Sequence, residues 1–372
     1  MDPLIPVTRP SLPPLGEFLP YLEDIWASRQ LTNCGPYHQR LERAMADYLG
    51  VAHLSLFANG TLALMTALQA LGVRGEVITT PYSFVATAHA LRWNQITPVF
   101  VDIDPHTLNL DPAAIEAAIT PRTTAILPVH CYGRRCDTAA IEAIARRHGL
   151  RVIYDAAHAF AVRDDGGSLL RHGDLSVLSL HATKVFNTFE GGAIVSPSAA
   201  AKAEVDALRN FGFVDEVSVA VAGINAKMSE FNAALGLLQL QHIDAALAQR
   251  ARVDRAYREA LADIDGIEPL PVMAGQTSNH GYFPIRVGSA YPLARDSLYQ
   301  RLRERNIHVR RYFYPLICEL AAYREASGVA RPPLPNARRI AAEVLCLPIF
   351  PDLLHAELQR VVSVIRASAN GR

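Results

Sequence analysis

The sequence predicts an α/β fold with a mostly parallel sheet and a second, smaller α+β domain. Half of the 372 residues are hydrophobic, and single cores stop growing at roughly 250–300 residues, so more than one domain is expected. Between residues 39 and 195, short apolar segments alternate with helical patterns. The apolar segments lack a polar alternation, which is typical of strands covered on both faces. Strand–helix alternation of this kind indicates parallel strands joined by right-handed crossovers.

Seven strands are expected in this first part of the chain. Each is a short run of apolar and β-branched residues, and a segment with helical spacing of its apolar residues follows each of the first four. The expected strands are 53–57, 76–80, 97–103, 124–129, 151–155, 176–180 and 192–196, and the expected helices are 60–71, 83–93, 111–119 and 137–149.

The rest of the chain follows a different pattern. Residues 227–264 form one long helical pattern without proline, which we expect to run out of the large domain into the smaller one. We therefore predict a large domain of residues 1–245 and a small C-terminal domain of residues 246–372. The small domain is expected to hold one strand and three helices, at 281–287, 292–305, 335–345 and 353–366.

Charge and composition exclude several classes of function. Lys plus Arg and Asp plus Glu each number 36, so no basic surface for nucleic acid or anionic membranes is indicated. The apolar runs are far shorter than the ~20 residues of a membrane span, and the proline-rich N-terminus does not resemble a signal peptide. The five cysteines are scattered, without a CxxC pair, so we expect reduced thiols in a cytoplasmic protein and no metal site.

Polar or aromatic residues follow five of the predicted strands at their carboxyl ends. Ligands of open α/β sheets bind outside this edge, because the loops after the strands converge there. The residues are Asn59, Gly60 and Thr61 after the first strand, Tyr82, Ser83 and Phe84 after the second, His130 after the fourth, Asp155 and His158 after the fifth, and His181 and Lys184 after the sixth.

Taken singly, these residues have ordinary structural explanations. Asn59 could be a helix N-cap, Asp155 an ion-pair member and Lys184 a surface lysine. Together they supply the parts of a pyridoxal phosphate site: a helix start for the phosphate, an aromatic plane, a carboxylate that keeps the pyridine nitrogen protonated, and a lysine. A desolvated lysine loses its proton more readily and becomes a competent nucleophile. No Walker or GxGxxG pattern is present, so a nucleoside triphosphate or a dinucleotide is not indicated.

Several motifs in order resemble the DegT/DnrJ/EryC1/StrS family of sugar aminotransferases over nearly the whole chain. These are fold-type I pyridoxal phosphate enzymes, so the resemblance implies an aspartate-aminotransferase-like fold. The motifs are IPVTRPSLPPL (5–15), LTNCGPYHQRLE (31–42), TPYSFVATAHAL (80–91), DAAHAF (155–160), LSLHATKVFNTFEGGA (178–193), GINAKMSEFNAALG (223–236) and LCLPIFPDL (345–353).

The resemblance implies roles for the residues around the cofactor ring. Lys184 would be the Schiff-base lysine and Asp155 the partner of the pyridine nitrogen. Phe84 matches the aromatic residue that stacks on the ring. His158 stands where many relatives have a glutamine near the ring hydroxyl, which keeps a hydrogen-bonding group at this position.

The resemblance also implies a phosphate site that two subunits share. Gly60 and Thr61 match the phosphate-binding turn, and Ser179 matches a further phosphate contact. Asn225 matches a residue that reaches the phosphate of the neighbouring subunit. A homodimer with shared active sites is therefore expected.

The lysine loop HATKVFNTFEGG (181–192) is most similar to that of enzymes making 4-amino-4,6-dideoxy sugars. The resemblance implies amino transfer from glutamate to a nucleotide-linked 4-keto-6-deoxyhexose, expected to be dTDP-4-keto-6-deoxyglucose, giving dTDP-4-amino-4,6-dideoxyglucose. Family members with histidine in place of this lysine are dehydratases, so Lys184 favours transamination.

Substrate contacts are expected from the segment RRYFYPL (310–316), which would line the substrate entrance. Its side chains can bind a donor carboxylate or a sugar diphosphate, although each is equally explained as a surface charge or a core tyrosine. The candidates are Arg310, Arg311, Tyr312 and Tyr314, together with His181 of the lysine loop.

Two alternatives stay open at this point. A C3-specific sugar aminotransferase or a glutamine-dependent cyclitol aminotransferase would use the same cofactor, and product regiochemistry would distinguish them. A non-catalytic regulator that kept the fold belongs to another class, and the intact Lys184, Asp155 and phosphate turn argue against it. A Rossmann sugar dehydrogenase would need the glycine fingerprint that this sequence lacks.

Overall fold

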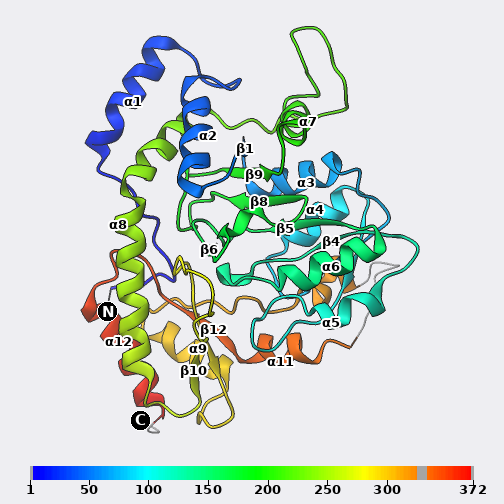
Figure 1. Ribbon diagram of the computed structural model, residues 1–372. Helices are drawn as coiled ribbons and strands as arrows, with labels where there is room; N and C mark the ends of the chain where they lie inside the picture. The colour runs from blue at the N-terminus through cyan, green and yellow to red at the C-terminus, as the bar shows by residue number, and fades with distance from the viewer. Residues whose placement is uncertain (1–2, 325–332, 370–372) are drawn as a thin grey trace.

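A seven-stranded sheet organises the larger part of the protein in the computed structural model, which describes residues 3–324 and 333–369 (Figure 1). The strand order is β1-β9-β8-β5-β4-β2-β3, and β9 is antiparallel to both of its neighbours, whereas the other pairs are parallel. The strands are β1 (His53–Phe57), β2 (Glu76–Thr79), β3 (Thr97–Phe100), β4 (Thr123–Leu127), β5 (Arg151–Asp155), β8 (Leu175–Ser179) and β9 (Gly192–Ser196).

Helices cover both faces of this sheet. Successive strand residues point to opposite faces, so Val77 of β2 packs in a cluster with α3, α4 and α7, while Ile78 packs with α5 and α6. A third cluster fills the space between the sheet and the helices α1, α2 and α8. The helices are α1 (Leu15–Ser28), α2 (Pro36–Leu49), α3 (Gly60–Ala70), α4 (Ala86–Trp93), α5 (Pro112–Ile115), α6 (Thr138–His148), α7 (Ala199–Arg209) and α8 (Glu230–Leu261).

A smaller α/β unit packs at the far end of α8 around its own core. Val253, Tyr257 and Leu261 of α8 belong to this core, as does Ile5 from the N-terminal segment. The predicted boundary between residues 245 and 246 falls within α8, and the two-domain division stays a prediction. The elements of this unit are β10 (Ile267–Pro269), β11 (Phe283–Val287), β12 (Val344–Leu347), α9 (Arg295–Glu304), α11 (Pro335–Glu343) and α12 (His355–Ala369).

The mostly parallel seven-stranded sheet predicted from the sequence is confirmed. One difference lies in the small unit, where the helix expected at 335–345 ends at Glu343 and Val344 begins strand β12. The apolar run Val344–Leu347 pairs with β11 and is fully buried, so sheet pairing overrides the helical pattern there. Within the described ranges, no helix is both long and apolar enough to cross a membrane.

Candidate active site

A cavity of about 290 Å³ lies at the carboxyl ends of the parallel strands. The loops after β1, β2, β5 and β8 converge here, and Tyr282 and Phe313 of the C-terminal half close the cavity. The structure thus brings together most of the residues predicted from the sequence. Those that line the cavity are Asn59, Gly60, Thr61, Ser83, Phe84, Asp155, His158, Ser179, His181, Lys184 and Tyr312.

The start of α3 forms one end of the cavity and has the properties of an anion cradle. The Asn59 side chain caps the helix by accepting a hydrogen bond from the backbone N–H of Leu62 at 2.9 Å. Helix N-termini carry free N–H groups and a positive dipole, which favour phosphate. A Cβ on Gly60 would lie 3.0 Å from the Cβ of Ser179, so glycine lets β8 bring its serine hydroxyl close to the helix start without displacing either segment.

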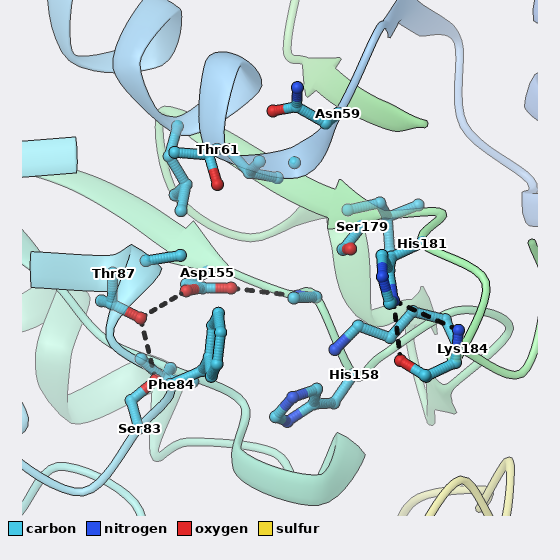
Figure 2. A pocket seen from close by; sticks show the side chains of 18 of the residues that line it. Asn59, Thr61, Ser83, Phe84, Thr87, Asp155, His158, Ser179, His181 and Lys184 are labelled. Atoms are coloured by element: carbon cyan, nitrogen blue, oxygen red, sulfur yellow. Dashed lines mark hydrogen bonds between the residues drawn. The ribbon is translucent and has the colours of Figure 1, made fainter. Parts of the chain in front are cut away.

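Asp155 ends β5 at the floor of the cavity, and its side chain is held by two hydrogen bonds (Figure 2). Thr87 Oγ1 donates to one carboxylate oxygen at 2.8 Å, and the backbone N–H of Ala157 donates to the other at 3.1 Å. Ser83 in turn contacts the Thr87 hydroxyl at 2.8 Å. Burial raises the pKa of Asp155, while the two hydrogen bonds and the positive charge of Lys184 act in the opposite direction.

Lys184 extends into the cavity from the loop after β8 (Figure 2). The chain has three lysines; Lys202 forms an ion pair with Asp206, and Lys227 binds Asn210 outside the cavity. Burial lowers the pKa of Lys184 to about 8, against the attraction of the Asp155 carboxylate. At pH 7 about one amine in ten is therefore neutral, which makes Lys184 a usable nucleophile and base.

The walls around the amine are aromatic. Lys184 Nζ donates a hydrogen bond to the Tyr282 hydroxyl at 3.4 Å. His158 is buried, with its ring 4.7 Å from the Tyr282 ring and parallel to the Phe313 ring. Burial and the charge of Lys184 hold the pKa of His158 well below its usual value, so this imidazole is neutral.

The protonation of the His158 ring follows from its backbone partner. The N–H of Tyr132 points at His158 Nδ1 at 3.1 Å, so Nδ1 accepts and the neutral ring carries its proton on Nε2. Tyr132 itself is held by its hydroxyl group, which donates to the carbonyl oxygen of Tyr312. The His158 ring thus presents a hydrogen-bond donor to the cavity.

Six predicted residues lie outside the cavity lining. Tyr82 and His130 are fully buried. Asn225 is exposed, on the segment after α7. Arg310 and Tyr314 are exposed, and Arg311 pairs with Asp296 at 2.9 Å while its guanidinium also packs over the Tyr314 ring. The roles assigned to these residues stay predictions.

Some residues that line the cavity were not predicted from the sequence. Thr87, in the first turn of α4, is one of them; Ser83 was named after the second predicted strand, but neither hydroxyl was expected to support Asp155. Tyr282 comes from a distant segment that no local pattern marks, and Phe313 lies in the segment 310–316 expected at the entrance but was not among its named candidates.

The donor set fits pyridoxal phosphate. The anion cradle at Gly60 suits its phosphate, Asp155 suits a protonated ring nitrogen, and Lys184 suits its aldehyde. One cavity of this chain therefore brings together groups suited to the phosphate, the ring nitrogen and the aldehyde of the cofactor.

Comparison with known proteins places the chain among the aminotransferases. A model of the DegT/DnrJ/EryC1/StrS aminotransferase family matches residues 16–366. The chain is 58% identical, over 98% of its length and 99% of the relative, to dTDP-4-amino-4,6-dideoxy-D-glucose transaminase of Shigella dysenteriae. A crystal structure of DesI in the presence of its TDP-sugar product aligns with a TM-score of 0.95 and 39% identity, covering 100% of this chain and 95% of that one. A structure of NtdA from Bacillus subtilis with bound cofactor PMP aligns at 0.87 and 28%, covering 96% and 82%.

Proposed function

Since the chain belongs to the DegT/DnrJ/EryC1/StrS aminotransferase family, we propose that it transfers an amino group from glutamate to C4 of dTDP-4-keto-6-deoxyglucose, with pyridoxal phosphate as its cofactor. The product would be dTDP-4-amino-4,6-dideoxyglucose. One observation carries the chemistry: a buried lysine with a pKa of about 8 shares a cavity with a buried carboxylate and an anion cradle. The choice of sugar is supported by the 58% identity to a transaminase of that name.

The phosphate and the ring of the cofactor would be held from opposite ends of the cavity. The N–H groups at Gly60 and Thr61 and the hydroxyl of Ser179 would bind the phosphate. Asp155 would pair with the ring nitrogen, and Phe84 would pack on the ring. When bound, pyridoxal phosphate supplies an electron sink for the carbon that loses its proton.

Lys184 would carry the proton between donor and acceptor carbons. Its neutral amine would take the proton from the α-carbon of glutamate as a general base, and in the second half of the reaction its ammonium would deliver a proton to C4 of the keto sugar as a general acid. A pKa of about 8 leaves both protonation states populated near neutral pH, as this double role requires. The Tyr282 hydroxyl, at 3.4 Å from Nζ, would orient the amine, and the Nε2–H group of His158 would be the donor available to the ring hydroxyl group of the cofactor.

A homodimer with shared active sites in the cytoplasm completes the proposal. The segment after α7 projects from the body of the subunit and exposes large apolar side chains, as expected of a surface that meets a second copy (Figure 1). Asn225 lies at the end of this segment and would contact the phosphate bound by the neighbour. The exposed apolar residues are Phe211, Phe213, Val214, Val217, Val219, Val221 and Ile224.

The test is the position of the new amine. Purified protein loaded with pyridoxal phosphate is incubated with dTDP-4-keto-6-deoxyglucose and ¹⁵N-glutamate, and the sugar is analysed by NMR. We expect one ¹⁵N on C4 for each 2-oxoglutarate formed, and none with the Lys184→Ala variant. An amine on C3 would show that the enzyme is specific for C3 rather than C4. Transfer from glutamine to a cyclitol ketone instead would show that the substrate is not a nucleotide sugar. No transfer to any acceptor would favour a non-catalytic protein.

A further inference from the structure

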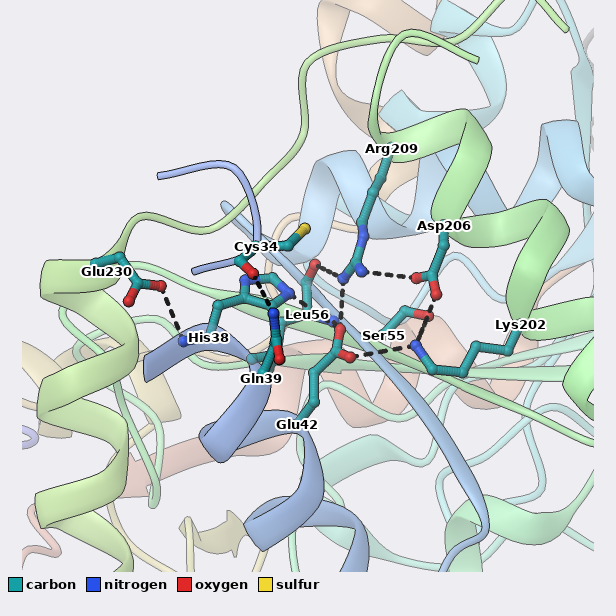
Figure 3. A network of polar contacts seen from close by, with 10 residues as sticks. All are labelled: Cys34, His38, Gln39, Glu42, Ser55, Leu56, Lys202, Asp206, Arg209 and Glu230. Atoms are coloured by element: carbon teal, nitrogen blue, oxygen red, sulfur yellow. Dashed lines mark hydrogen bonds and ion pairs between the residues drawn. The ribbon is translucent and has the colours of Figure 1, made fainter. Parts of the chain in front are cut away.

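A network of charged and polar side chains lies next to Cys34, outside the cavity (Figure 3). Cys34 is half-buried and lies two residues before α2, where its backbone has a φ of 57°. His38, on the first turn of α2, has an exposed fraction of 1%. Its Nε2 lies 3.1 Å from the carboxylate of Glu42, one turn further along the same helix.

Glu42 is fixed as a carboxylate by three further donors. The same oxygen that meets His38 accepts from the backbone N–H of Leu56 at 3.0 Å and from Arg209 at 2.6 Å. Lys202 donates to the second oxygen at 3.2 Å. Burial alone would raise the pKa of Glu42, but the hydrogen bond from His38 and the two cations hold it far below its usual value. The carboxylate therefore stays ionised and orients the imidazole.

The other ring nitrogen of His38 is the unusual feature. Nδ1 is buried and has no hydrogen-bond partner of ordinary geometry within the described ranges, while the Cys34 side chain lies next to His38 (Figure 3). Burial would lower the pKa of His38, but its hydrogen bonds to Cys34 and Glu42 raise it to about 9. Burial likewise would raise the pKa of Cys34, yet the hydrogen bond to His38 and the charge of Arg209 lower it overall.

We propose that Cys34, His38 and Glu42 form a thiol modification site, in which the imidazole activates the sulfur toward hydrogen peroxide and other soft electrophiles. Glu42 orients the ring, and His38 stabilises the thiolate and supplies the proton. Thiolates, not thiols, are the nucleophiles, and cysteines beside a protonated histidine react selectively.

The reaction with peroxide balances with these groups alone. The Cys34 thiolate attacks one peroxide oxygen, so an S–O bond forms and the O–O bond breaks. The leaving hydroxide takes the proton from the His38 imidazolium and departs as water. Sulfur is oxidised by two electrons to a sulfenic acid, and the peroxide is reduced.

The other cysteines of the chain provide internal controls. Cys318 is half-buried like Cys34, but burial raises the pKa of its thiol. Cys131, Cys136 and Cys346 are fully buried, and burial raises the pKa of each of these thiols as well. A difference in reactivity between Cys34 and Cys318 therefore reports on the groups around each thiol rather than on burial alone.

Alkylation of the native, cofactor-loaded protein tests the proposal without any substitution. Limiting iodoacetamide is added at pH 7, and labelling at each cysteine is followed with time by peptide mass spectrometry. We expect Cys34 to react at least about tenfold faster than Cys318, because its thiolate fraction is larger. Equal rates, or faster labelling of Cys318, would overturn the proposal.

A second experiment uses hydrogen peroxide, with dimedone to trap sulfenic acid, on the wild type, His38→Gln and Cys34→Ser. We expect the adduct on Cys34 in the wild type, a loss of about tenfold in His38→Gln and none in Cys34→Ser. The rise of the Cys34 alkylation rate with pH should also move to higher pH in His38→Gln. The charged groups that remain near the thiol in this variant are Glu42, Arg209 and Lys227. An unchanged pH profile and adduct yield in His38→Gln would contradict a role for the imidazole.

Discussion

At the scale of single residues, burial determines the chemistry of Lys184. The sequence places it among apolar and hydroxyl residues, and the structure adds the aromatic wall of Tyr282 and the opposing charge of Asp155. A lysine in water is almost fully protonated at pH 7, whereas this one has a pKa of about 8. The proposed nucleophile and base is thus activated by its surroundings before any ligand arrives.

One prediction concerns the rate at which the cofactor-free protein captures pyridoxal phosphate. Only the neutral amine attacks an aldehyde, so the fraction of competent protein rises about tenfold per pH unit below the pKa of Lys184 and levels off above it. We expect the rate, measured by stopped-flow absorbance, to rise from pH 6 to 8 and then flatten. A rate that still rises tenfold between pH 9 and 10 would show an ordinary lysine.

A second prediction concerns the support of Asp155. Thr87→Val removes a hydrogen bond that lowers the pKa of this carboxyl, so the pKa of Asp155 rises further. The reaction requires Asp155 in its ionised form. On acidification, the variant should therefore lose activity at a higher pH than the wild type does. Ser83→Ala is the matched control, since Ser83 contacts Thr87 but not Asp155. The measurement is kcat/KM as a function of pH. If the fall of kcat/KM at low pH moves by the same amount in both variants, Thr87 is not the specific support of the Asp155 carboxylate.

How far these residues could be predicted from the sequence depends on their distance from a strand end. Lys184, Asp155 and Gly60 follow directly after recognisable strands, so their convergence could be expected. Tyr282 and Phe313 reach the cavity only because the C-terminal half packs against this edge of the sheet. That packing depends on the whole chain, so a local sequence pattern cannot predict it.

At the scale of elements, strands were predicted more completely than the helices around them. β1 and β5 are short segments rich in apolar residues, and both were predicted to the residue. The direction of β9 was not predicted, because an apolar run such as Gly192–Ser196 reads the same in either direction. Helices α1, α2 and α7 were not predicted either; they lie on the outer surface of the large sheet, and several of their residues are exposed.

The start of α2 supports a prediction about stability. The Glu230 side chain, at the first turn of α8, accepts hydrogen bonds from the backbone N–H groups of Tyr37 and His38 at 2.7 and 2.9 Å. Glu230→Ala leaves both buried donors unpaired, so the free energy of unfolding should fall by about 1–3 kcal/mol. Urea unfolding of the cofactor-free protein measures this change.

Glu23→Ala is the control for that experiment, because Glu23 is exposed on α1. We expect its unfolding midpoint to match the wild type within error, since surface substitutions change stability little. If both variants lower the midpoint equally, the capping account of Glu230 is wrong.

At the scale of the whole molecule, the proposed sharing of active sites can be tested with mixed subunits. Asn225 does not line the cavity of its own chain, whereas Lys184 does. If Asn225 acts across the interface, a hybrid of Lys184→Ala and Asn225→Ala subunits has one site with both defects and one intact site. Random mixing makes half of the dimers hybrids, so refolding the two inactive variants together should restore about a quarter of wild-type activity.

Either variant refolded alone is the control for the mixing experiment, and should remain inactive or weakly active. Mixed subunits that gain nothing over the separate variants would place Asn225 in the site of its own subunit. If the protein is a monomer with full activity, the proposal that two subunits share each active site is wrong.

The claim that Lys184 holds the cofactor is tested most directly by borohydride reduction and peptide mapping. Reduction converts the link between pyridoxal phosphate and an amine into a stable secondary amine, which mass spectrometry assigns to one of the three lysines. The account predicts the pyridoxyl group on Lys184, the lysine that lines the cavity beside Asp155. A pyridoxyl group on Lys202 or Lys227, or on no lysine of the loaded protein, would contradict it.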